Sequence, residues 1–148
     1  MRRIVSRSAL IVAAVLTALS GQAIAEDEGP DGLTATALGE FLAKLQRAVA
    51  VDDPAQVAPL MRFPLRVFGV PRVKGTVKAD EFRALYPSIF TPEVKQALQS
   101  QKAAELFRRD QGAMVGNGQV WISGICSDKT CSHVQIRVIT VNVPPSKH

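Results

Sequence analysis

The hydrophobic and polar positions between residues 113 and 143 alternate in the way that is typical of antiparallel strands. Two short polar connections interrupt this stretch. The first contains Asn117-Gly118, a pair that favours a type I′ turn because both central residues must tolerate positive φ. Such a turn pairs Met114 with Trp121 across the two strands. The pattern therefore predicts three successive antiparallel strands.

The second connection lies between Cys126 and Cys131, the two cysteines of the chain. If these residues face each other, Trp121 lies opposite Ile136, and both turns place the same side chains on one face of the sheet. We expect this face to be the inner one, with Trp121 at its centre. Its members are Met114, Trp121, Ile125, Val134 and Ile136.

The opposite face then carries aliphatic residues that a strand face turned to water rarely shows. They are Val120, Ile122, Ile139 and Val141. Contiguous apolar patches tend to be covered, so this face predicts a homodimer in which one patch serves both subunits. Coverage by a helix or by the Pro144-Pro145 tail of the same chain is the alternative.

The N-terminal half shows the three- and four-residue spacing of amphipathic helices, beginning after Thr34 or Thr36, either of which can cap a helix. Asp53 and Pro54 open a second, short helix. A strand follows near Phe63, and further helices are expected from residue 79 and after Thr91. This order predicts an α+β fold, with a curved antiparallel sheet of about four strands wrapped around the N-terminal helices like a cone.

Residues 1–25 have the pattern of a secretory signal peptide. Three arginines precede an apolar run that is too short to span a bilayer comfortably, and a small-residue cleavage site ends at Ala25. A membrane anchor or a buried helix is the alternative. We expect an exported protein, periplasmic or secreted, without stable membrane insertion. The remaining chain divides into a mobile acidic tail at 26–32, a single domain at 33–143 and a C-terminal tail at 144–148.

The charge of the chain does not favour a nucleic-acid partner. Its 18 Lys and Arg residues include three in the leader, which leaves 15 bases against 13 acids. Six bases cluster in the middle of the chain, where a solvated surface is the expected role and an anionic partner the alternative. They are Arg62, Arg66, Arg72, Lys74, Lys78 and Arg83.

The two cysteines predict a disulfide, because an exported chain meets an oxidising compartment. The four intervening residues differ from the C-x-x-C spacing of redox motifs, and two histidines can hardly complete a zinc site. Cys126 and Cys131 are therefore expected to form a structural bridge.

Three segments carry a family resemblance. They are FLAKLQRAVAVDDPAQVAPLMRFPLRV, EFRALYPSIFTPEV and LFRRDQGAMVGNGQVWISGIC. In these segments the chain resembles exported bacterial proteins of the nuclear transport factor 2-like (cystatin-like) superfamily, most specifically at residues 62–65 and 112–121. The resemblance implies a bent sheet around the N-terminal helices, often with an apolar pocket at the wide end of the cone. It implies little about function, because this fold carries enzymes and binding modules alike.

Isomerase chemistry in such a cone would need a carboxylate base and an acid donor. Tyr86, the only tyrosine, could act with Asp53, Asp80 or Asp110, but a core role for Tyr86 and a capping role for Asp53 explain these residues as well. His133 is expected to be exposed. No nucleophile, phosphate-loop or metal-binding motif is found in the sequence. We therefore assign no catalytic, cofactor-binding or metal-binding residue and expect no cofactor.

The sequence thus favours a non-catalytic exported domain that binds a small apolar ligand in the cone or a protein on the sheet. A pocket enzyme of isomerase or hydrolase type is the alternative, and an inhibitor role would use loop 69–75 or loop 127–130. The expected pocket lining is Phe41, Leu45, Met61, Tyr86, Met114, Trp121 and Ile136.

Overall fold

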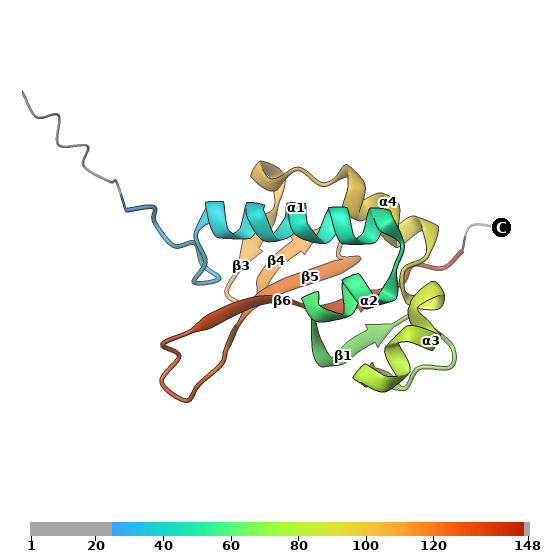
Figure 1. Ribbon diagram of the computed structural model, residues 1–148. Helices are drawn as coiled ribbons and strands as arrows, with labels where there is room; N and C mark the ends of the chain where they lie inside the picture. Colours follow the sequence, from blue (N-terminus) through green and yellow to red (C-terminus); the bar gives the residue numbers. More distant parts are fainter. Residues whose placement is uncertain (1–24, 147–148) are drawn as a thin grey trace, which may run out of the picture.

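The structure is a computed structural model, and it describes residues 25–146, so the expected signal peptide lies outside the described residues except for Ala25. The described chain is an α+β domain, as predicted, and Figure 1 shows its helices gathered on one side of a twisted sheet. No helix in this part of the chain is long and apolar enough to cross a membrane. The helical elements are α1 (Ala35–Val51), α2 (Pro54–Val57), η1 (Ala58–Leu60), α3 (Ala79–Ile89), α4 (Pro92–Ser100) and η2 (Ala103–Glu105). The strands are β1 (Met61–Phe68), β2 (Gly75–Val77), β3 (Phe107–Arg109), β4 (Gly112–Val115), β5 (Val120–Cys126) and β6 (Val134–Asn142).

The six strands form one open sheet in the order β2-β1-β6-β5-β4-β3. Every neighbouring pair is antiparallel except β1 and β6, which run parallel. The prediction of about four antiparallel strands is therefore only roughly correct. The parallel pair was missed because β1 belongs to the helical half of the chain, and no local pattern signals its pairing with the last strand.

Pro64 lies within β1, which pairs with β2 on one side and with β6 on the other. The pairing of β1 with β6 shifts register between Met61 and Arg66, the segment that contains Pro64. Proline has no N–H, so it cannot donate a hydrogen bond to the neighbouring strand. An interruption of the hydrogen-bond ladder at Pro64 therefore costs no backbone donor. The irregular register thus lets a proline occupy a strand that has neighbours on both sides.

The helix starts follow the predicted capping residues. Thr34 accepts a hydrogen bond from Ala37 N at 3.1 Å, Asp53 accepts one from Ala55 N at 2.9 Å, and Thr91 accepts one from Val94 N at 3.4 Å. The apolar stripe of α1 is buried against the sheet, and its residues are Leu38, Phe41, Leu42, Leu45, Ala48 and Val49. Local sequence signals therefore determine where these helices begin and which side they bury.

On β4 and β5, the face of the sheet that packs against the helices is the opposite of the one predicted, whereas Ile136 of β6 packs against the helix-side core as expected. Val120 and Ile122 are fully buried there, whereas Trp121 is partly exposed on the other face and Val134 is 48% exposed. The register of the first turn is nevertheless as predicted, with Met114 paired to Trp121. The error came from the assumption that the only tryptophan marks the core, since register alone does not say which face is buried.

The second register also differs from the prediction. Trp121 pairs with Thr140 instead of Ile136, and Cys126 pairs with Val134, so the disulfide lies partly in the connection and does not fix the pairing. The face expected to form a homodimer is instead largely covered by the same chain. Of its four residues, three are fully buried in the helix-side core, and they are Val120, Ile122 and Val141.

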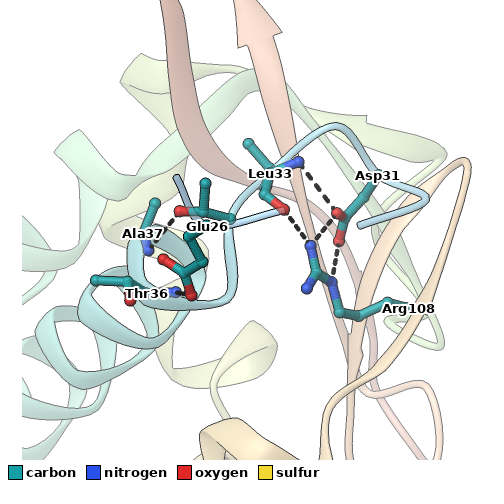
Figure 2. Close-up of polar contacts among 7 residues, drawn as sticks. Glu26, Asp31, Leu33, Thr36, Ala37 and Arg108 are labelled. Carbon is teal, nitrogen blue, oxygen red and sulfur yellow. Dashed lines mark hydrogen bonds and ion pairs between the residues drawn. The ribbon is translucent and has the colours of Figure 1, made fainter. Parts of the chain in front are cut away.

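The acidic segment 26–32, expected to be a mobile tail, is attached to the domain. Glu26 accepts a hydrogen bond from Thr36 N at 3.0 Å, and Asp31 forms an ion pair with Arg108 of β3. Figure 2 shows these contacts together, with the Arg108 guanidinium enclosed by the chain around Asp31 and Leu33. The segment thereby joins the start of α1 to the edge of the sheet.

Candidate functional site

The outer face of the sheet carries a line of side chains that crosses all six strands. Successive cross-strand pairs connect its members from β3 at one edge to β2 at the other. We call these residues the outer row: Phe107, Met114, Trp121, Thr140, Arg66 and Thr76. Because side chains alternate along a strand, the neighbours of this row, such as Val115 and Val120, point to the helix-side core.

Three members of the outer row are apolar and at least partly exposed, whereas Thr140 in the middle of the row is buried. Phe107 is 54% exposed, and Phe68, the next outward residue after Arg66 on β1, is 52% exposed. Trp121 is partly exposed, and Ile139, at the irregularity beside it, is buried without belonging to the helix-side core. Figure 1 shows the helices on the opposite side of the sheet. The described chain thus leaves this apolar strip at least partly exposed.

The electrostatic character of this face is positive. The strand sequences contain arginines but no aspartate or glutamate. Arg62 and Arg66 are exposed on β1, and neither forms an ion pair within residues 25–146. Arg109 of β3 lies 3.9 Å from the exposed carboxylate of Asp110, which is a weak contact. The apolar strip therefore has cationic side chains near both ends.

The residues expected to line a cone pocket do not surround one cavity. Phe41, Leu45, Met61 and Tyr86 are buried in the helix-side core, and Ile136 packs against that core. Met114 and Trp121 belong to the outer row, on the other side of the sheet. The space between the sheet and the helices, where the pocket was expected, is filled by side chains of α1, such as Leu45, which is completely buried.

A groove of about 750 Å³ lies instead between the β1–β2 loop, α3 and the C-terminal segment. Its apolar lining includes Val70, Leu85 and Val143, and its charged lining includes Arg72 and Glu93. This volume is within the range of small-molecule sites. The opposite charges of Arg72 and Glu93 give the groove no clear preference for an anion or a cation.

Tyr86 lies in an aromatic cluster on α3, where its ring stacks on Phe90 at 5.0 Å between centroids and meets Phe82 edge-on at 5.8 Å. Its hydroxyl is buried and has no hydrogen-bond partner in the described chain. Asp52, at the end of α1, forms a 2.7 Å ion pair with Lys95 of α4, and the Lys95 ammonium lies 5.9 Å from the centre of the Tyr86 ring.

These surroundings determine the protonation states of the Tyr86 phenol and the Asp52 carboxyl. Burial, and then the negative charge of Asp52, raises the pKa of the Tyr86 phenol above its ordinary value. The hydrogen bond from Lys95 lowers the pKa of Asp52. At neutral pH the phenol stays protonated and the carboxylate stays charged. Tyr86 does not line the 750 Å³ groove, so that groove does not present Tyr86 and Asp52 to a substrate as an acid–base pair.

The carboxylate beside Tyr86 is not one of the three that sequence reasoning selected. Asp53, Asp80 and Asp110 were the candidates, and Asp53 contributes only a further weak charge effect on the phenol. Asp52 was missed because it follows the last turn of α1 in a left-handed conformation, with φ of 61°. No spacing rule connects that position to a tyrosine on a different helix.

The tip of the β5–β6 hairpin is organised by Asp128 and by the predicted disulfide between Cys126 and Cys131, which the structure confirms. The Asp128 carboxylate accepts hydrogen bonds from the hydroxyls of Ser132 and Thr130, both at 2.7 Å, and these bonds lower its pKa. His133 is exposed, as expected, and it lies in the connection just before β6. Within the described residues, no group of three metal-ligating side chains occurs.

Replacing both Cys126 and Cys131 with serine is expected to lower the free energy of unfolding by no more than about 2 kcal/mol, because the bridge closes a very short loop. The Asp128 hydrogen bonds remain in the variant and continue to order the tip. Urea denaturation of the serine variant and of the oxidised parent measures the difference. Loss of the native fold in the variant would contradict the structural role assigned to the bridge.

Comparison with known protein families, with curated proteins and with solved structures found no match to this chain.

Proposed function

We propose that the protein is a non-catalytic binding domain that docks a partner protein on the outer face of its sheet. The observation that carries this proposal is the outer row, in which Phe107, Met114 and Trp121 form an apolar, at least partly exposed strip across β3, β4 and β5. Contiguous exposed apolar patches are more typical of interaction sites than of the rest of a protein surface. Tryptophan and arginine are also the side chains that most often dominate the energy of protein interfaces.

The positive charges on this face indicate which kind of partner surface would bind to it. Arg62 and Arg66 approach the strip from β1 and Arg109 approaches it from β3, while no strand contributes a carboxylate. A partner that has an apolar surface edged by Asp or Glu would complement both features. A second copy of the same face would bring arginines without acids to neutralise them. An apolar centre with a charged rim also resembles a protein interface more than a nucleic-acid groove.

We propose, in addition, that this binding takes place outside the cytoplasm. The signal-peptide pattern of residues 1–25 and the Cys126–Cys131 bridge support export, because disulfides persist in oxidising compartments. Membership of the nuclear transport factor 2-like superfamily remains a prediction from the sequence resemblance. An enzymatic role receives less support, since the Tyr86 hydroxyl is buried and Tyr86 does not line the 750 Å³ groove.

A photo-crosslinking amino acid in place of Phe107 is expected to capture a specific protein in the compartment to which the chain is exported. Val51, which is 60% exposed on the helix side, provides the matched control position. The captured protein should shift the fluorescence of Trp121, the only tryptophan, when the two purified proteins are mixed. Trp121→Ala should then weaken binding by about 2 kcal/mol or more, roughly 30-fold in Kd.

Arg66→Glu should weaken the same complex, whereas Arg83→Glu on the exposed side of α3 should leave it unchanged. Equal capture from Phe107 and Val51 would show that the outer row is not the docking face. Capture of a second copy of this chain would replace the proposed partner with a homodimer.

A further inference from the structure

A second groove, of about 560 Å³, lies between α1, the α2–η1 segment and β6. Three cationic side chains line it: Lys44 and Arg47 from α1, and Arg137 from β6. No carboxylate belongs to its lining. The remaining wall is largely apolar and includes Val51, Pro59 and Leu60. The groove therefore combines concentrated positive charge with an apolar surface.

None of the three cations has an acidic partner in the described part of the chain. The ion pairs found there are formed by Lys95, Lys102, Arg108 and Arg109. Lys44 and Arg47 are three residues apart, so they project from neighbouring positions on the same side of α1.

The nearest acids along the chain are engaged elsewhere or do not pair with these cations. Asp52 is paired with Lys95, and Asp53 caps the start of α2 through Ala55 N. Glu40 lies one helical turn before Lys44 without forming an ion pair with it. The field in the groove is thus that of several like charges without internal compensation.

Arg137 is held in position by its own strand. Its Nη1 donates to the carbonyl oxygen of Ile136 at 2.8 Å, and its Nη2 donates to Oε1 of Gln135 at 2.8 Å. A guanidinium has five N–H donors, so these two bonds orient the group and leave donors for a ligand. Less side-chain entropy is then lost when a ligand binds.

We propose that this groove binds a phosphate monoester, or a similar dianion, that carries an apolar substituent. The dianion would lie among Lys44, Arg47 and Arg137, where the guanidinium fork matches the geometry of phosphate oxygens. The substituent would lie against Val51 and Leu60. The site is independent of the proposed docking face, because none of its lining residues belongs to the outer row.

The test uses the mature protein with phenyl phosphate, inorganic phosphate and benzyl alcohol as probes, at constant ionic strength and with amide chemical shifts as the readout. Phenyl phosphate is expected to shift the resonances of α1 and β6 around the groove. Inorganic phosphate should bind there more weakly, and benzyl alcohol should have no effect at the same concentration. Arg137→Gln should weaken phenyl phosphate binding by about tenfold or more, because hydrogen bonds to charged groups are lost.

Two further variants separate the site from a general effect of charge. Arg47→Gln, on the exposed side of α1, removes a groove cation without touching the sheet and should also weaken binding. Arg83→Gln makes the same change of charge on α3, which does not line the groove, and should leave binding unchanged. Equal losses in all three variants, or no perturbation around the groove in the parent, would overturn the proposal.

The same phosphate chemistry occurs in soluble esters and in lipid headgroups, and a vesicle experiment distinguishes these sources. Co-sedimentation with phosphatidylcholine vesicles containing phosphatidic acid, lost in Arg137→Gln, would assign the site to a headgroup. Phenyl phosphate binding without vesicle binding would assign it to a soluble ester. Absence of both would overturn the site.

Discussion

Replacing Ile122 with alanine is expected to lower the free energy of unfolding by about 2–5 kcal/mol, whereas replacing its neighbour Trp121 with alanine should cost clearly less. Ile122 is completely buried between the sheet and the helices, so its truncation leaves a cavity in close-packed surroundings. Trp121 lies on the outer face and remains partly exposed, so its truncation removes less buried surface. Urea denaturation of the two variants measures both free energies.

The comparison of these two variants tests which face of the sheet is the core. A larger loss for Trp121→Ala than for Ile122→Ala would mean that the tryptophan face is the packed one, and the docking face proposed here would then be part of the interior. Val120→Ala provides a second core position on the same strand, and it should resemble Ile122→Ala in the direction of its effect. Thr76→Ala, at the exposed end of the outer row, should change stability little.

Features that depend on a few neighbouring residues could be predicted from the sequence. The caps at Thr34, Asp53 and Thr91 are confirmed, because each depends on one side chain reaching a backbone N–H two or three residues away. The Asn117-Gly118 turn set the pairing of β4 with β5 correctly for the same reason. The disulfide followed from cysteine count and compartment.

Features that depend on long-range packing could not be predicted. Both faces of β5 carry large apolar side chains, so alternation did not distinguish the face beneath the helices from the outer face. Local patterns also gave no signal for the parallel pairing of β1 with β6. A register shift beside Ile139 displaces the second half of β6 relative to β5, and no turn residue in the sequence indicates such a shift.

The candidate sites were missed for a related reason. Phe107 and Trp121 belong to strands separated by β4, and they form one strip only after the sheet has assembled. Lys44 and Arg47 are visible as neighbours on a helix, but Arg137 reaches the same groove from the last strand. Asp31 was assigned to a tail because its partner lies 77 residues further along the chain.

Replacing Asp31 with alanine is expected to lower the free energy of unfolding by about 3 kcal/mol, since it leaves a largely buried guanidinium without its counter-charge. The side chain of Asp31 is completely buried, and that of Arg108 is 19% exposed. Asp31 Oδ2 accepts a hydrogen bond from Arg108 Nε at 2.9 Å, and Leu33 N donates to Asp31 Oδ1 at 3.2 Å. The neighbouring Arg109–Asp110 pair is exposed, so Asp110→Ala serves as the control with little expected effect.

The contribution of the Asp31–Arg108 pair to stability should depend on pH in a defined direction. Burial of the Asp31 carboxyl opposes ionisation, but the hydrogen bonds from Arg108 and Leu33 outweigh it and lower the pKa. A carboxyl whose pKa is lower in the folded state stabilises that state above the unfolded pKa of about 3.9. The stability difference between the parent and Asp31→Asn should therefore be constant near neutral pH and decrease as the pH falls below that value towards the lower folded pKa.

Amide hydrogen exchange then shows which segments of the domain are destabilised by the substitution. Arg108 is in contact with both Asp31 and the carbonyl oxygen of Leu33, so it ties the segment before α1 to β3 at the edge of the sheet (Figure 2). If the pair stabilises the whole domain, Asp31→Asn should accelerate exchange in β5 and β6 as well as at residues 26–34. Acceleration confined to residues 26–34 would show that the ion pair only attaches this segment. A stability difference that does not change between pH 7 and pH 3 would show that the Asp31 charge contributes nothing to folding.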